Sequence, residues 1–131
     1  MLDAGTATYR AGEYLTTPEL DIFLTHAHLD HVVGLTYLFS VMHAHPLTRI
    51  TLHGLLEKLA AVEEHLFSEA LFPARPPFEC RPLEESFALP GGGRLTHFPL
   101  DHHGGSIGYR HDWPGHSMAY VTDTTADADA A

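Results

Sequence analysis

The sequence predicts a mixed α/β protein built in layers. Two observations predict this fold class. Short apolar runs of strand length alternate with helix-like segments in the first half, and strands separated by glycine-rich turns fill the second half. The chain has 131 residues, of which 44% are hydrophobic and 18% charged. That is enough for one packed domain, so we expect a single domain over 1–131 with a frayed tail over 124–131.

Strands and helices are expected to alternate in the first half. The end of a strand is predicted at 2–4, where Gly5 breaks it, and a short helix or turn at 8–15. The residues at 20–25 are large and apolar, which predicts a buried strand. Residues 31–43 are apolar on nearly every side, which predicts a buried helix.

The remaining elements follow from spacing, prolines and glycines. A short strand is predicted at 49–53, and an amphipathic surface helix at 55–70, where glutamates lie off the apolar stripe. The next stretch cannot be helical, because it contains Pro73, Pro76, Pro77 and Pro82. After a turn at 91–93 we expect three strands, with turns at 104–105 and 113–115, over residues 94–100, 106–111 and 118–122.

Composition excludes several classes of function. Seven Lys and Arg residues against 17 Asp and Glu residues leave a net charge of −10. This argues against a general nucleic-acid coat protein and against binding to an anionic membrane. No apolar run is long enough to span a membrane, and Met1–Gly5 does not resemble a secretory signal. Cys80 is the single cysteine, so no disulfide framework or thiolate zinc site is expected, and a cytoplasmic location is the default.

Twelve histidines are the unusual feature of the composition, and they are densest at His26-Ala27-His28-Leu29-Asp30-His31. Four potential ligands fall within six residues, between a predicted strand and a predicted helix. Imidazole and carboxylate groups suit zinc, manganese or iron. One ion cannot easily take all four from so short a loop. Two ions can, with His26 and His28 on one and Asp30 and His31 on the other.

Later strand ends offer further ligands. His102 and His103 follow one predicted strand, and Asp123 follows another, where its carboxylate could bridge two ions about 3.5–4 Å apart. Chemistry alone does not separate His102 from His103. Four residues could orient the ligands or be ordinary turn and strand-end residues: Asp3, Thr25, Asp101 and Thr122.

These motifs resemble those of the metallo-β-lactamase-fold hydrolases. The segment Thr25-His26-Ala27-His28-Leu29-Asp30-His31, followed by Gly34-Leu35, looks like the hallmark of that superfamily. Leu2-Asp3-Ala4-Gly5-Thr6 looks like the strand and turn that precede it. Leu100–Arg110 and Tyr120–Thr124 are similar to the third and fourth metal motifs. The segment Gly-Gly-Ser-Ile-Gly-Tyr-Arg at 104–110 most resembles the phosphodiesterase branch near ribonuclease Z.

The resemblance implies an αββα sandwich with two divalent metal ions, of which zinc is the default and manganese or iron an alternative. It selects His102 over His103, which lies where family members often have proline. It also assigns the ligands: His26, His28 and His102 to one metal, Asp30 and His31 to the second, and Asp123 as the bridge.

The chain departs from the family at both ends. Family members usually have a further histidine beyond the bridging acid, whereas here only eight residues follow Asp123, and the sequence starts inside the first motif. We therefore expect an incomplete sandwich, either a fragment or a degenerate half-domain. Its exposed sheet surface would then favour self-association into a homo-oligomer.

The functional prediction is a dinuclear metal-dependent hydrolase that cleaves a phosphodiester with a metal-activated water. Asp30 and Asp123 are the candidate catalytic carboxylates, and the expected substrate is a small-molecule or nucleotide-type phosphodiester. Two alternatives remain: the same fold acting on a thioester, lactone or β-lactam, and a non-catalytic metal-binding or interaction domain. Gly104–Gly108 matches the GxSxG pattern of serine hydrolases, but the sequence after it predicts a strand instead of the required helix.

Overall fold

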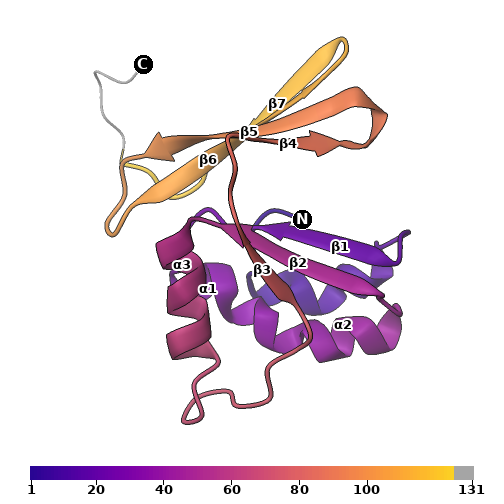
Figure 1. Cartoon of the computed structure of the whole chain (residues 1–131), viewed down its shortest axis with the longest axis vertical. Coiled ribbons are helices and arrows are strands. Elements are labelled where there is room, and N and C mark those ends of the chain that lie inside the picture. Colours follow the sequence, from indigo (N-terminus) through magenta and orange to yellow (C-terminus); the bar gives the residue numbers. More distant parts are fainter. Residues whose placement is uncertain (126–131) are drawn as a thin grey trace. The chain divides into compact units, whose positions relative to one another are not determined.

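The computed structural model describes residues 1–125, and the chain divides into two compact units, Met1–Leu83 and Glu84–Ala131 (Figure 1). Each unit has its own sheet. The single domain over 1–131 stays a prediction, because two such units can belong to one domain. The predicted frayed tail lies outside the described residues from 126 onward, whereas Thr125 within it hydrogen-bonds to the backbone of Asp101.

The first unit is built on a three-stranded parallel sheet. Its strands are β1 (Glu19–Phe23), β2 (Arg49–Gly54) and β3 (Glu79–Pro82), in the order β1-β2-β3. Leu2 adds one parallel bridge to Phe23, which is what remains of the strand end predicted at 2–4. The predicted strands at 20–25 and 49–53 correspond to β1 and β2. β3 was not predicted, because its residues are mostly exposed and it ends on a proline.

Short helices connect these strands, and no helix among residues 1–125 is long and apolar enough to cross a membrane. They comprise the 3₁₀ segments η1 (Thr6–Glu13) and η2 (Val33–Tyr37), the α-helices α1 (Leu29–Val32), α2 (Leu38–Ala44) and α3 (Leu56–Ala61), and the π-helix η3 (Val62–Leu66).

The continuous helix predicted over 31–43 is wrong, because the structure divides this stretch into α1, η2 and α2. Gly34 explains the interruption. A Cβ atom on Gly34 would overlap the carbonyl oxygen of Gly5, so the two backbones are in direct contact. The hydroxyl of Thr36 also donates to the carbonyl of Val33 at 2.6 Å, a bond that competes with regular helix.

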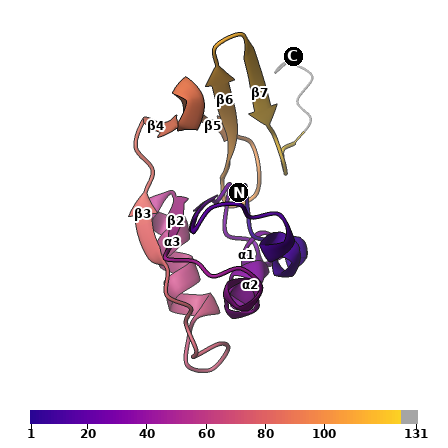
Figure 2. The same ribbon diagram turned by 90° about the vertical axis from the view of Figure 1, so that its right-hand side faces the viewer.

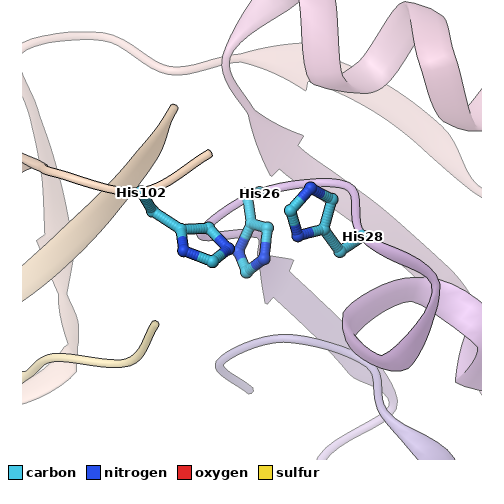
Figure 3. Close-up of side chains that lie close together, drawn as sticks. All are labelled: His26, His28 and His102. Carbon is cyan, nitrogen blue, oxygen red and sulfur yellow. The ribbon is translucent and has the colours of Figure 1, made fainter. Parts of the chain in front are cut away.

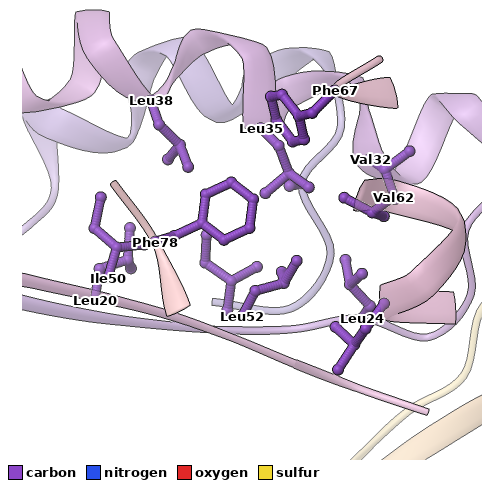
Figure 4. Packing of buried hydrophobic residues seen from close by; sticks show 13 residues of the cluster. Leu20, Leu24, Val32, Leu35, Leu38, Ile50, Leu52, Val62, Phe67 and Phe78 are labelled. Carbon is purple, nitrogen blue, oxygen red and sulfur yellow. The ribbon is translucent and has the colours of Figure 1, made fainter. Parts of the chain in front are cut away.

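The core of the first unit lies between its sheet and its helices (Figure 4). Alternate residues of β1 and β2 supply one side of the cluster, as expected for strands with one face buried. The helices supply the other side, and the cluster includes Leu20, Ile22, Ile50, Leu52, Val32, Leu35, Leu38, Leu59 and Val62.

The second unit is an antiparallel sheet in chain order β4-β5-β6-β7. The strands are β4 (Ser86–Leu89), β5 (Gly93–Leu100), β6 (Ser106–Trp113) and β7 (His116–Tyr120), with a short 3₁₀ turn η4 (Pro90–Gly92). Figure 2 shows the β6–β7 hairpin. The last three strands were predicted from their turns, whereas β4 was not. Its four residues alternate between exposed and half-buried, and so carry no strong apolar signal.

Candidate metal centre

The histidine loop lies where β1 ends. β1 runs to Phe23, and the buried residues Leu24 and Thr25 lead directly into His26, whose exposed fraction is 1%. His28 is exposed and is the N-cap of α1. In parallel sheets, ligands bind outside the carboxyl ends of the strands. The loop therefore has the expected position for a binding site.

Three imidazoles gather on this loop. The ring centroids of His26 and His28 are 4.6 Å apart at an interplanar angle of 81°, and Figure 3 shows the two rings. The rings of His26 and His31 are 4.2 Å apart at 46°. Oδ2 of Asp30, whose side chain is 76% exposed, lies 3.5 Å from Nε2 of His31. The structure thus brings together the four loop residues predicted as ligands.

The buried carboxylate of Asp3 hydrogen-bonds to residues of the loop. Asp3 is 6% exposed and adopts a left-handed backbone conformation with φ of 52°, which aspartate tolerates better than most residues. Its carboxylate accepts hydrogen bonds from the backbone N–H of Thr25 at 2.7 Å and from the Thr25 hydroxyl at 2.9 Å. Nδ1 of His31 lies 3.0 Å from the same carboxylate.

Counting protons along this network gives the tautomers of two neutral rings. The Thr25 hydroxyl has one proton and donates it to Asp3, so it must accept a proton from Nδ1 of His26, 2.9 Å away. The Asp3 carboxylate can only accept, so Nδ1 of His31 is also protonated. In both rings Nε2 carries the lone pair. Such an imidazole, held through Nδ1–H, is the form that binds metals, so this donor set fits a divalent ion.

The second unit brings together its own two candidates. Nε2 of His102 and Oδ2 of Asp123 are 3.8 Å apart, and both side chains are partly exposed, at 24% and 38%. A tight turn holds His102: the N–H of Gly105 donates to its carbonyl at 2.8 Å, and Gly104 and Gly105 both have φ of 81°. His103 is exposed on the same turn.

The predicted orienting residues differ in what they do. Asp3 and Thr25 hydrogen-bond to ligand rings as described above. Thr122 makes one long contact, 3.4 Å from its hydroxyl to Oδ1 of Asp123. Asp101 takes part through its backbone carbonyl, which accepts two hydrogen bonds from Thr125. The structure does not support the candidate serine site, because Ser106 begins strand β6, which leads into strand β7 instead of the helix that the GxSxG motif requires.

Ala4 and Gly34 also hold the loop through backbone hydrogen bonds, a role that their place in the sequence motifs did not predict. The N–H of Ala4 donates to the carbonyl of His31, and the N–H of Gly34 donates to the carbonyl of Ala4, both at 2.8 Å. These bonds join the segment after Leu2 to the start of the helices. A glycine inside an apolar helical pattern was the signal that could have revealed the contact.

Comparison with known proteins identifies the family. A family model described as a β-lactamase superfamily domain matches residues 2–131. The chain belongs to this family. Solved structures agree with the match, and one of them is described as a metallo-β-lactamase fold protein. A search of curated proteins finds no match.

Three solved structures illustrate the likeness. Zinc-bound PqqB from Methylobacterium extorquens is 18% identical with a TM-score of 0.67, over 98% of this chain and 50% of that chain. The metallo-β-lactamase fold protein YhfI from Bacillus subtilis is 13% identical with a TM-score of 0.70, over 98% and 51%. Human short-form tRNase Z is 18% identical with a TM-score of 0.62, over 93% and 57%.

These identities establish the fold and nothing finer. The predicted α/β class and metallo-β-lactamase fold are confirmed. The chain spans about half the length of PqqB and YhfI. Zinc is present in the PqqB structure by its description.

Proposed function

We propose that this chain carries the metal centre of a dinuclear metal-dependent hydrolase that cleaves phosphodiesters. The observation that supports it most is the loop after β1, where three imidazoles and a carboxylate gather and two of the rings are oriented by Asp3 and Thr25. A chance cluster of surface histidines has no reason to have Nδ1 of two rings fixed by one buried network.

The proposed ligand sets are those implied by the family resemblance: His26, His28 and His102 for one ion, Asp30 and His31 for the second, and Asp123 between them. Zinc is the first choice for imidazole and carboxylate donors, with manganese or iron as alternatives. Two divalent ions, when bound, would polarise a phosphoryl oxygen and bring the pKa of a water close to neutrality.

The chain's own residues then have separate tasks. Asp3 and Thr25 hold Nδ1–H of His31 and of His26, so that in each neutral ring Nε2 carries the lone pair. Asp30 is the proposed proton acceptor, since its carboxylate is 76% exposed and adjoins His31. Asp123 is the alternative acceptor. With only seven Lys and Arg residues in the chain, positive charge at the substrate would come mainly from the metals.

A phosphodiester is favoured as substrate for two reasons. The Gly-Gly-Ser-Ile-Gly-Tyr-Arg segment is most like the phosphodiesterase branch, and the structurally similar proteins include human tRNase Z, yeast PDE1 and a diphosphatase of the PhnP family. The proposed substrate is a small-molecule or nucleotide-type diester. A thioester, lactone or β-lactam remains the alternative within the same fold.

Metal content and turnover test the proposal together. Purified protein should bind two equivalents of zinc by elemental analysis and hydrolyse bis(p-nitrophenyl) phosphate. Asp30→Ala should abolish turnover, as should His102→Ala, whereas Asp112→Ala and His103→Ala are matched exposed controls that should not. One equivalent of metal with no turnover of any ester would instead indicate a non-catalytic metal-binding or interaction domain.

A further inference from the structure

An apolar groove of about 170 Å³ opens in the first unit beside the histidine loop. Its lining includes Ala27 and Leu29, together with Ala61 from α3 and His65 from η3. His28 lies between Ala27 and Leu29 in the chain. Two residues that line the groove are therefore the chain neighbours of a proposed metal ligand.

The rim of this groove leaves large apolar side chains in water. Leu29 is 65% exposed and Leu71 is 71% exposed, although both line the groove. Neighbouring apolar exposure of this kind marks ligand grooves more often than ordinary surface. Filling the groove with an apolar group would remove part of both side chains from water.

The backbone beside the groove is also unusual. η3 is a π-helix, in which the N–H of Phe67 donates to the carbonyl of Val62, five residues earlier, at 3.2 Å. Val62 and His65 of this segment line the groove. Single π turns inside helices are rare and frequently occur at functional sites.

The chemistry of the lining defines what could bind. Among the described residues that line the groove there is no Lys, Arg, Asp or Glu, and His65 is the single polar side chain. A second phosphate would find no cation here other than a protonated His65. A cavity of about 150 Å³ with comparable apolar walls binds benzene in an engineered protein, so this groove has room for one aromatic ring.

We infer that this groove binds an apolar, ring-sized ester substituent of the phosphodiester substrate. The inference rests on the proposed function and narrows it, because it favours a small diester carrying an aryl or similar group over a polynucleotide, whose neighbouring phosphates would meet an uncharged wall.

Two substrates with the same leaving group test the inference by kinetics. Bis(p-nitrophenyl) phosphate and methyl p-nitrophenyl phosphate both release p-nitrophenol and differ in the group that stays. Ala61→Phe fills the groove, and Ala60→Phe on the exposed side of α3 is the matched control. The ratio of kcat/KM for the two substrates should fall about tenfold in Ala61→Phe and stay unchanged in Ala60→Phe. Comparing ratios cancels the difference in intrinsic reactivity.

A binding measurement keeps the inference testable even without turnover. Diphenyl phosphate should shift the methyl NMR signals of Ala27, Leu29, Ala61 and Leu71 in the unsubstituted chain, and dimethyl phosphate should not. Hydrolysis with equal ratios in all variants and no methyl shifts would overturn the groove and leave the proposed function intact. Shifts without hydrolysis of either substrate would overturn the proposed function and keep the groove as a binding site.

Discussion

The two units hold their candidate ligands in different ways. In the first unit, His26 and His31 are tied to Thr25 and Asp3, whose side chains are 0% and 6% exposed. In the second, Nε2 of His102 and Oδ2 of Asp123 are 3.8 Å apart on partly exposed side chains, and the hydroxyl of Thr122 lies 3.4 Å from Oδ1 of Asp123. The comparison teaches that the preorganisation described for the first unit comes from one buried carboxylate, which orients two rings of the proposed ligand set.

The largest effect is expected for zinc affinity when the negatively charged carboxylate of Asp3, which accepts hydrogen bonds from Thr25 and His31, is replaced. Asparagine tolerates the same left-handed backbone, but its NH₂ group cannot accept from Thr25 and His31. Asp3→Asn should lower zinc affinity by roughly 10–100-fold, the usual cost of losing a partner behind a metal ligand. Competition with a chelating dye measures it. Asp112→Asn, at an exposed ion pair with Arg110, is the control, and equal affinities in the two variants would contradict the role of Asp3.

Matched threonine substitutions compare the two units directly. Thr25→Val deletes a fully buried hydroxyl and removes one hydrogen bond from Asp3 and one from His26, so the free energy of unfolding should fall by about 1–3 kcal/mol. Thr122→Val removes a 3.4 Å contact on a half-buried residue and should cost clearly less. Urea unfolding followed by circular dichroism gives both values. Equal losses would show that the second pair is supported as firmly as the first.

The smallest effect on stability is expected at the partly exposed ion pair between Glu63 and Arg75 in the first unit. The hydrogen-bonded guanidinium of Arg75 holds the pKa of the Glu63 carboxyl below its ordinary value of 4.5. A lowered folded-state pKa means that the stabilising contribution is present above pH 4.5 and is lost as the pH falls through the folded value. Wild type should therefore exceed Glu63→Gln in its urea midpoint at pH 7 by a small margin.

That margin should shrink below pH 4.5, as the carboxyl of the wild type becomes protonated. The side chains of Arg75 and Glu63 are 34% and 39% exposed, so solvent screens the pair. A margin that is constant from pH 7 to pH 3 would show that the substitution acts through packing and not through charge.

Local patterns predicted much of the fold and of the candidate site. The strands β1, β2 and β5–β7 followed from apolar runs and turn residues, and the His26–His31 loop followed from the density of metal-binding side chains. Asp3 and Thr25 could be named as orienting candidates because they lie within the motif-bearing segments, next to or ahead of the candidate ligands. Only the structure shows which of the four candidates hydrogen-bond to a ligand ring, because the bonds of Asp3 join residues 22 and 28 positions apart in the chain.

The features that escaped prediction depend on contacts between distant backbone segments. The helix is interrupted at Gly34 because Gly34 contacts the backbone of Gly5. Strand β3 is defined by its pairing with β2, and its own residues carry no strong strand pattern. The π turn of η3 is a local exception: its hydrogen bond joins residues five positions apart, and it leaves no mark in the apolar spacing that predicted one helix over 55–70. Such features become visible only when both partners of the contact are in place.

The separation along the chain between Asp3 and the rings it orients couples metal binding to folding. In an unfolded chain the carboxylate is not beside Thr25 or His31, so the two rings have no preset tautomer or direction. A metal that depends on them binds the folded form alone. Free metal at 100 times its dissociation constant would then add about 2.7 kcal/mol to the stability of the fold, and a chelator would remove it. The increase in the thermal midpoint on adding metal thus measures how strongly the rings oriented by Asp3 bind the metal.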